Sequence, residues 1–217
     1  MTATAGYEPI LFDLDGTVVD SVALIRESHR HAVREVLGTT FSDERLVANV
    51  GRPLIDQMRA FSVDHAEELL RIYREWNHAH TPELLRAYDG IDGLLADLRA
   101  AGRTLGIITS KSHPTVDLAF DVLPIRHHFA VVIAAEDTDL HKPDPAPVRL
   151  ALQRLSADPA RACYVGDAPF DIQAARGAGI TAVGVTWGFF AADVLRDAGA
   201  DRIASSTGEL ASILLGR

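Results

Sequence analysis

The sequence is poor in cysteine and contains no long apolar run. Cys163 is the single cysteine among 217 residues, so no disulfide can form within the chain, which is typical of a reducing compartment. No uninterrupted apolar stretch reaches the roughly 18 residues that suggest a membrane-spanning helix. Residues 1–8 lack the basic and apolar regions of a signal peptide. We therefore expect a cytoplasmic protein that has no membrane partner.

Positive charge is also scarce. Lysine and arginine together number 21 against 30 acidic residues, which gives a formal net charge of −9. A surface of that sign repels phosphate backbones, so we expect no nucleic-acid partner. Hydrophobic residues make up 47% of the sequence, an ordinary value for a globular protein, and the length suits one large domain or a domain with a smaller one. We expect a monomer or a homodimer.

The spacing of apolar residues differs between two parts of the chain. Residues 18–88 are dominated by helical spacing, with helices expected at 21–37, 43–50, 54–61 and 64–80 and no convincing strand. Short apolar strands are expected at 9–12, 105–108, 129–134, 162–165 and 181–185, separated by helices. This alternation predicts an α/β fold with a Rossmann-like doubly wound parallel sheet, covered on both faces. The expected core is 1–17 and 89–217, with a small all-helical domain, 18–88, inserted after the first strand.

Polar side chains stand at the expected strand ends, where ligands bind in such a sheet. Asp13 and Asp15 follow the first strand and, two residues apart in extended chain, point the same way. The other strand-end groups are Thr109, Ser110, Lys142, Asp167 and Asp171. Four carboxylates at one edge of the sheet repel one another, which destabilises the fold unless a cation neutralises their charge. Carboxylate oxygens without clustered cysteine or histidine suit Mg²⁺ better than Zn²⁺.

Four segments in order resemble the motifs of the haloacid dehalogenase superfamily of phosphotransferases. Residues 12–20, Phe-Asp-Leu-Asp-Gly-Thr-Val-Val-Asp, resemble the first motif. Thr109 matches the second motif, Lys142 in Lys-Pro-Asp-Pro the third, and residues 166–171, Gly-Asp-Ala-Pro-Phe-Asp, the fourth. The alternating pattern extends the resemblance over essentially the whole chain.

The resemblance implies a reaction through Asp13. Asp13 would be the nucleophile that forms an aspartyl-phosphate, and it would also bind the metal. Asp15 would protonate the leaving oxygen, activate the water that follows, and bind Mg²⁺ through its backbone carbonyl. The dehalogenases of the superfamily lack an aspartate at the position of Asp15, so phosphoryl transfer is favoured.

The other motif residues would bind the metal and the phosphoryl group. Asp167 would be a direct metal ligand, while Asp171 would act behind it, through water or by holding Lys142. Lys142 would offset phosphate charge, and Thr109 with the backbone N–H of Ser110 would bind the phosphoryl oxygens. The expected metal set is thus Asp13, Asp15, Asp167 and Asp171.

The helical insert resembles a cap that closes over the site. Residues 51–54, Gly-Arg-Pro-Leu, resemble the superfamily's specificity loop, in which Arg52 would bind a second anionic group or would be a solvated surface residue. The two lysines of the sequence, Lys111 and Lys142, lie outside the insert, which argues against a phosphonoacetaldehyde hydrolase with its cap lysine. His141 is expected beside the site, and Trp187 to Phe190 are expected mainly in the core.

Several functions share these motifs. The leading hypothesis is a Mg²⁺-dependent phosphatase for a small anionic phosphate ester, because the motifs and residues 184–189 resemble phosphoglycolate phosphatases and their pyrophosphatase relatives. A β-phosphoglucomutase-type phosphomutase would use the same two aspartates. A receiver-type phospho-acceptor switch is disfavoured by Asp15 and by the insert. A non-catalytic binding protein is disfavoured by the intact motifs.

Overall fold

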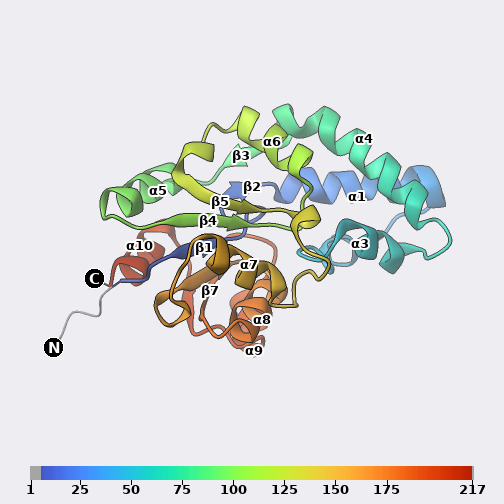
Figure 1. The fold of residues 1–217 in the computed structure, drawn as a ribbon. Coiled ribbons are helices and arrows are strands. Elements are labelled where there is room, and N and C mark those ends of the chain that lie inside the picture. Colours follow the sequence, from blue (N-terminus) through green and yellow to red (C-terminus); the bar gives the residue numbers. More distant parts are fainter. Residues whose placement is uncertain (1–5, 217) are drawn as a thin grey trace.

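A computed structural model describes residues 6–216, in which a parallel sheet is sandwiched between helices (Figure 1). The strands of this sheet are β1 (Ile10–Phe12), β4 (Leu105–Ile108), β5 (Phe129–Ile133), β6 (Cys163–Gly166), β7 (Thr181–Val185) and β8 (Arg202–Ala204). They pair in parallel in the order β5-β4-β1-β6-β7-β8. The chain therefore builds outward from β1 in both directions, which confirms the predicted doubly wound α/β fold.

The two faces of the sheet carry separate apolar layers. Side chains alternate along β1, so Ile10 and Phe12 enter one layer and Leu11 the other. The first layer packs under α5 (Ile91–Ala100), α6 (His113–Val122) and α10 (Thr207–Leu215). The second packs under α7 (Ala146–Arg154), α8 (Pro169–Gly177) and α9 (Ala192–Asp197). Strands buried on both faces explain their continuous apolar sequences.

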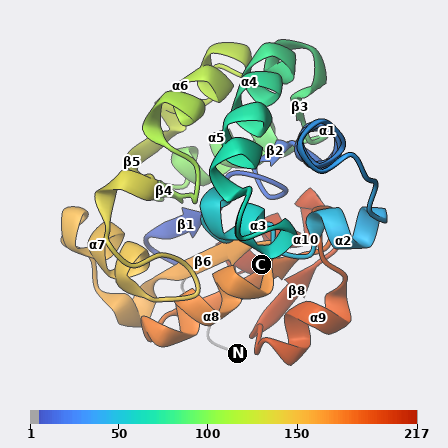
Figure 2. The same ribbon diagram turned by 90° about the vertical axis from the view of Figure 1, so that its right-hand side faces the viewer.

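A helical insert, residues 22–84, lies at one end of the sheet (Figure 2). It contains α1 (Val22–Leu37), α2 (Asp43–Val47), α3 (Leu54–Phe61) and α4 (Ala66–Leu84). All four helices contribute to one apolar cluster: Ala32, Val33, Leu46, Met58, Ala66, Leu69 and Tyr73. Two short antiparallel strands, β2 (Val19–Asp20) and β3 (Arg86–Ala87), flank the insert in the chain and bring its ends together.

Three expectations about the elements are wrong. Short strands β2 and β3 lie within residues 18–88, where no strand is expected, because a two-residue strand is too short to show alternation. Strand β8, at one edge of the six-stranded sheet, is also absent from the expected strands, and its three residues are likewise too few to show alternation. Helix α4 continues past Pro82 to Leu84 instead of stopping near 80, since proline near the end of a helix breaks few hydrogen bonds. Three 3₁₀ turns, Arg126–His128, Ala135–Asp137 and Pro159–Arg161, join the larger elements.

Within residues 6–216, no helix combines the length and the apolar character needed to cross a bilayer. The expectation that residues 1–8 do not form a signal peptide concerns in part residues 1–5, which lie outside the described residues.

His29 is an ionisable group in the apolar cluster of the insert. Its side chain is fully buried, and its ring centroid lies 4.8 Å from that of Tyr73 and 5.4 Å from that of Phe61. Burial lowers the pKa of His29 from its ordinary 6.5 to about 3. The ring is therefore neutral in the folded protein at every pH at which most proteins are studied.

This burial predicts a pH-dependent contribution to stability. Below pH 6.5 the unfolded chain protonates His29 and the folded protein does not, so stability falls as the pH decreases toward 3, by up to about 1.4 kcal/mol per pH unit. We expect the His29→Leu variant to lose this part of the pH dependence in urea unfolding measured between pH 7 and pH 4. The matched variant His127→Gln, at an exposed position, should keep it. Parallel pH profiles for wild type and His29→Leu would contradict the prediction.

Candidate functional site

The candidate site lies where the strand order reverses around β1. Asp13 follows β1, Thr109 follows β4, and Asp167 follows β6, so all three leave the carboxyl ends of adjacent parallel strands. The backbone N–H of Asp13 donates to the carbonyl of Val165 at 2.8 Å, which extends the ladder by one residue and fixes the Asp13 backbone. This is the position at which doubly wound sheets bind ligands.

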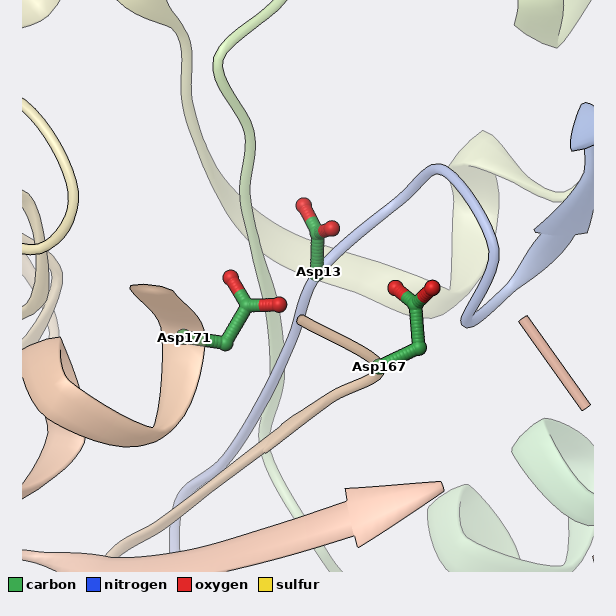
Figure 3. Close-up of side chains that lie close together, drawn as sticks. All are labelled: Asp13, Asp167 and Asp171. Carbon is green, nitrogen blue, oxygen red and sulfur yellow. The ribbon is translucent and has the colours of Figure 1, made fainter. Parts of the chain in front are cut away.

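Three buried carboxylates converge at this point (Figure 3). Asp13, Asp167 and Asp171 come from the end of β1, the loop after β6 and the first turn of α8. Each offers an oxygen, and these oxygens all lie within 4.8 Å of one another. None of the three residues is more than 3% exposed. Such a group is strongly repulsive unless positive charge lies beside it.

Lys142 supplies part of that positive charge. Its Nζ donates to Oδ1 of Asp13 at 2.9 Å and to Oδ1 of Asp171 at 2.7 Å. It also lies 3.2 Å from the hydroxyl of Tyr164, which in turn lies 3.0 Å from Oδ1 of Asp171. The lysine is 3% exposed, so removing it would leave two buried carboxylates without a partner.

The electrostatics of the cluster follow from burial and from excess negative charge. Burial raises the pKa of Asp13 to about 7, against the opposing effect of Lys142, and Asp171 adds to the rise. Burial, with Asp13 and Asp171, raises the pKa of Asp167 well above its usual range. Burial disfavours the charged form of Lys142, but the carboxylates of Asp13 and Asp171 outweigh it and raise its pKa.

Asp167 is held by the backbone around it. Thr17 Oγ1 donates to its Oδ1 at 3.2 Å, and the N–H of Phe189 donates to its Oδ2 at 2.7 Å. Gly16 and Gly188 pass so close that a Cβ at either position would collide with the Asp167 carboxylate. Gly16 also has a φ of +74°, a conformation that glycine adopts without strain.

Asp15 stands at the edge of the cluster with a lysine partner of its own. Its Oδ1 lies 3.2 Å from Nζ of Lys111, and both side chains are largely buried. The four carboxylates of Asp13, Asp15, Asp167 and Asp171 thus face two lysines, which leaves negative charge uncompensated when all are ionised. An all-oxygen donor set with that excess fits Mg²⁺.

Three backbone N–H groups close to Asp13 or Thr109 in the chain have no acceptor among the described residues. Those of Leu14, Asp15 and Ser110 donate to no group within residues 6–216. Thr109 is 5% exposed, and its Oγ1 accepts from the N–H of Lys111 at 3.2 Å. The Ser110 hydroxyl does not face the carboxylates, because it donates to the carbonyl of Gly51 in the insert at 2.7 Å. Free N–H groups in such a loop are suited to binding an anion.

The site opens into a cavity of about 280 Å³ between the sheet and the insert. Asp13, Asp15, Thr109, Ser110, Lys142 and Asp167 line it from the sheet side, as does His141. Arg52 lines it from the insert, where its guanidinium lies 5.2 Å from the ring centroid of Phe170 and its carbonyl accepts from Gln57 at 2.8 Å. Every expected site residue except Asp171 reaches this cavity, and Asp171 lies behind Lys142.

Some contributors are not evident from the sequence. The Tyr164 hydroxyl faces the lysine from inside a strand that reads as apolar. Trp187 packs against the core, as expected, but its indole N–H also donates to the carbonyl of Thr17 at 3.1 Å. In the sequence, only a threonine in the first motif and a tryptophan in a glycine-containing loop point to the contact between Thr17 and Trp187, and both are weak signals.

Comparison with known proteins agrees with the resemblance carried by the four sequence motifs. The sequence model of the family described as haloacid dehalogenase-like hydrolase matches residues 10–185. The pyrophosphatase PpaX of Bacillus velezensis is 37% identical over 178 residues, which are 82% of each chain.

Solved structures have the same fold. A predicted phosphatase from Clostridium acetobutylicum aligns with a TM-score of 0.88 at 27% identity and covers 98% of this chain and 100% of its own. A predicted phosphoglycolate phosphatase from Haemophilus somnus aligns with a TM-score of 0.87, covering 95% and 97% of the two chains. Its 23% identity supports the fold alone.

Proposed function

The chain belongs to the haloacid dehalogenase-like hydrolase family, and from that premise we propose that it is a Mg²⁺-dependent phosphatase. In this proposal the enzyme hydrolyses a small anionic phosphate ester through an aspartyl-phosphate on Asp13. Family membership confirms the resemblance carried by the four sequence motifs. The observation that carries the proposal is the buried group of Asp13, Lys142, Asp167 and Asp171 at the wall of a small cavity.

Asp13 is the nucleophile. Lys142 contacts only its Oδ1, so the second oxygen is available to attack phosphorus. The ion pair with Lys142 favours the ionised carboxylate, which burial alone disfavours. In the first step the bond from the Asp13 oxygen to phosphorus forms, and the bond from phosphorus to the leaving oxygen breaks.

The loops around Asp13 bind the phosphoryl oxygens. The N–H groups of Leu14, Asp15 and Ser110 and the hydroxyl of Thr109 donate to them. Lys142 adds a buried positive charge beside the same position. Donors fixed by the backbone need no reorganisation as charge develops, which is the main source of their effect.

Asp15 moves the protons. It lies at the cavity wall, two residues after the nucleophile, and gives a proton to the leaving oxygen in the first step. In the second step it accepts a proton from water, which attacks phosphorus and breaks the bond to Asp13. Phosphate leaves and the Asp13 carboxylate is restored.

Asp13, Asp167 and the backbone carbonyl of Asp15 would hold the metal, a role that the buried carboxylate oxygens of Asp13 and Asp167 support. Bound Mg²⁺ would offset the negative charge of the phosphate and of the carboxylates. Thr17 and the N–H of Phe189 orient Asp167 for this role, while Asp171 orients Lys142.

The helical insert, with its flanking strands, acts as a cap over residues 1–17 and 89–217. Its own apolar cluster supports a separate packing unit within the insert, while Val18, Val19, Leu24 and Leu85, near its two ends, pack in the cluster of the sheet. By covering the cavity it excludes water while the first step takes place. Arg52 lies on the cap side of the cavity and binds a second anionic group of the substrate. A cytoplasmic location and a monomeric or homodimeric state stay predictions.

A pyrophosphatase is the second candidate. The relative from Bacillus velezensis carries that name at 37% identity, and pyrophosphate fits the same site with its second phosphate in place of the organic group. The two candidate substrates differ only in the leaving group, which is an organic alcohol in the ester and a second phosphate in pyrophosphate.

Phosphate release separates these candidates. We expect Mg²⁺-dependent turnover, with one of phosphoglycolate, pyrophosphate and a set of sugar phosphates leading by about tenfold in kcat/KM. Asp13→Asn should reduce turnover below about one per cent, since an amide cannot act as this nucleophile. Asp144→Asn is the matched control, because Asp144 accepts from the N–H of Ala146 and its amide can do the same. Turnover by Asp13→Asn above a few per cent would refute the proposal, and a requirement for a sugar bisphosphate would identify a mutase.

Metal binding has a readout that needs no turnover. Saturating Mg²⁺ at about 100 times its Kd should raise the Tm of the wild type by roughly 5–10 °C. The Asp167→Asn variant removes one repelling charge, so we expect it to be at least as stable as wild type without metal and to lose the Mg²⁺ response. Glu136→Gln is the control, because Glu136 lines the cavity outside the carboxylate group. Equal Mg²⁺ shifts in wild type and Asp167→Asn would contradict the assignment.

A further inference from the structure

Helix α4 contributes a second arginine to the cavity. Tyr73, Arg74, Asn77 and His78 all line it, and their spacing places them on one face of the helix. Tyr73 and Asn77 are buried at the base of this face, 5% and 2% exposed. Arg74 and His78 are more exposed and stand at its rim.

Contacts of Asn77 and His78, one turn after Arg74, fix the position of this helical face. The side-chain amide of Asn77 donates to Ser28 Oγ of α1 at 2.9 Å. His78 Nε2 lies 3.2 Å from Thr115 Oγ1 of α6, which links the insert to a helix of the sheet layer. The backbone of Arg74 is therefore held by a packed helix that borders the cavity.

The two arginines of the cavity are among the described arginines that form no ion pair. Among the residues that the structure describes, neither Arg52 nor Arg74 has a carboxylate oxygen within 4.0 Å. By contrast Arg71, one turn earlier on α4, is paired with Glu75 at 2.8 Å. On the sheet side Lys111 is paired with Asp15, and Lys142 with Asp13 and Asp171. The insert side of the cavity thus carries the unpaired positive charge.

We propose that Arg74 is a further specificity-determining residue, which joins Arg52 in binding the second anionic group of the substrate. The inference rests on the proposed function, which places the reacting phosphate at Asp13 on the opposite wall. Two arginines without carboxylate partners match a second phosphate or a carboxylate, both of which they can bind through paired N–H groups. The volume of about 280 Å³ limits the substrate to a small molecule.

The test compares substrates with and without the second charge. Pyrophosphate and phosphoglycolate carry it, as a phosphate and as a carboxylate, and p-nitrophenyl phosphate does not. We expect Arg74→Gln to raise KM by about tenfold for the substrate or substrates whose second anionic group it binds and by less than about twofold for p-nitrophenyl phosphate, with kcat nearly unchanged. Arg52→Gln should behave alike, and Arg74→Lys should recover part of the loss.

Arg71→Gln is the matched control, since it removes the same charge from the same helix away from the cavity. It should leave the KM of all three substrates unchanged. A selective effect on pyrophosphate identifies a second phosphate as the ligand, and one on phosphoglycolate identifies a carboxylate. Equal effects of Arg74→Gln on all three substrates, or no effect on any, would overturn the proposal.

A binding measurement separates this inference from the proposed function. In the Asp13→Asn protein, calorimetry compares pyrophosphate with inorganic phosphate, which lacks the second group. Arg74→Gln in that background should weaken pyrophosphate binding by about tenfold and leave phosphate binding within about twofold. That result would support this role of Arg74 even if no substrate were turned over, and equal weakening of both ligands would refute the role while leaving the catalytic proposal standing.

Discussion

The contact between Lys142 and two buried aspartates is the interaction on which the site depends. Asp13 and Asp171 come from different elements, and each would be repelled by the other and by Asp167 without the lysine between them. Lys142 therefore joins the loop before α7 to the end of β1 and to the start of α8. The arrangement still has an excess of negative charge, and that excess is what makes a divalent cation and a phosphate suitable ligands together.

The strand order explains why these groups meet. β1 is central, with β4 on one side and β6 on the other, so residues about 100 and 150 positions apart in the sequence leave the sheet side by side. The insert is joined to the chain shortly after Asp13, through β2 and β3, and lies over the carboxyl ends of the strands. Aspartates on the sheet side and unpaired arginines on the insert side give the cavity opposite charges on opposite walls.

Much of the core could be predicted from sequence, because its strands are apolar and each ends in a polar motif residue. The motifs place Asp13, Thr109, Lys142 and Asp167 at one edge, and the structure brings them there. The short strands β2, β3 and β8 could not be predicted, since two or three residues carry no periodicity. Contacts made by the backbone, such as the N–H of Phe189 on Asp167, could not be predicted either. The same holds for the position of Arg74 at the cavity, because its helical spacing alone does not show what lies opposite.

The central claim is covalent catalysis by Asp13, and trapping the intermediate tests it most directly. In Asp15→Asn, hydrolysis of the intermediate lacks its base, while p-nitrophenolate leaves without protonation, so the aspartyl-phosphate should accumulate. Borohydride reduces an acyl phosphate to an alcohol, and peptide mapping would then find homoserine at position 13 in an amount equal to the burst of nitrophenolate. A burst of nitrophenolate with Asp13 unmodified, or homoserine at another aspartate, would contradict the account.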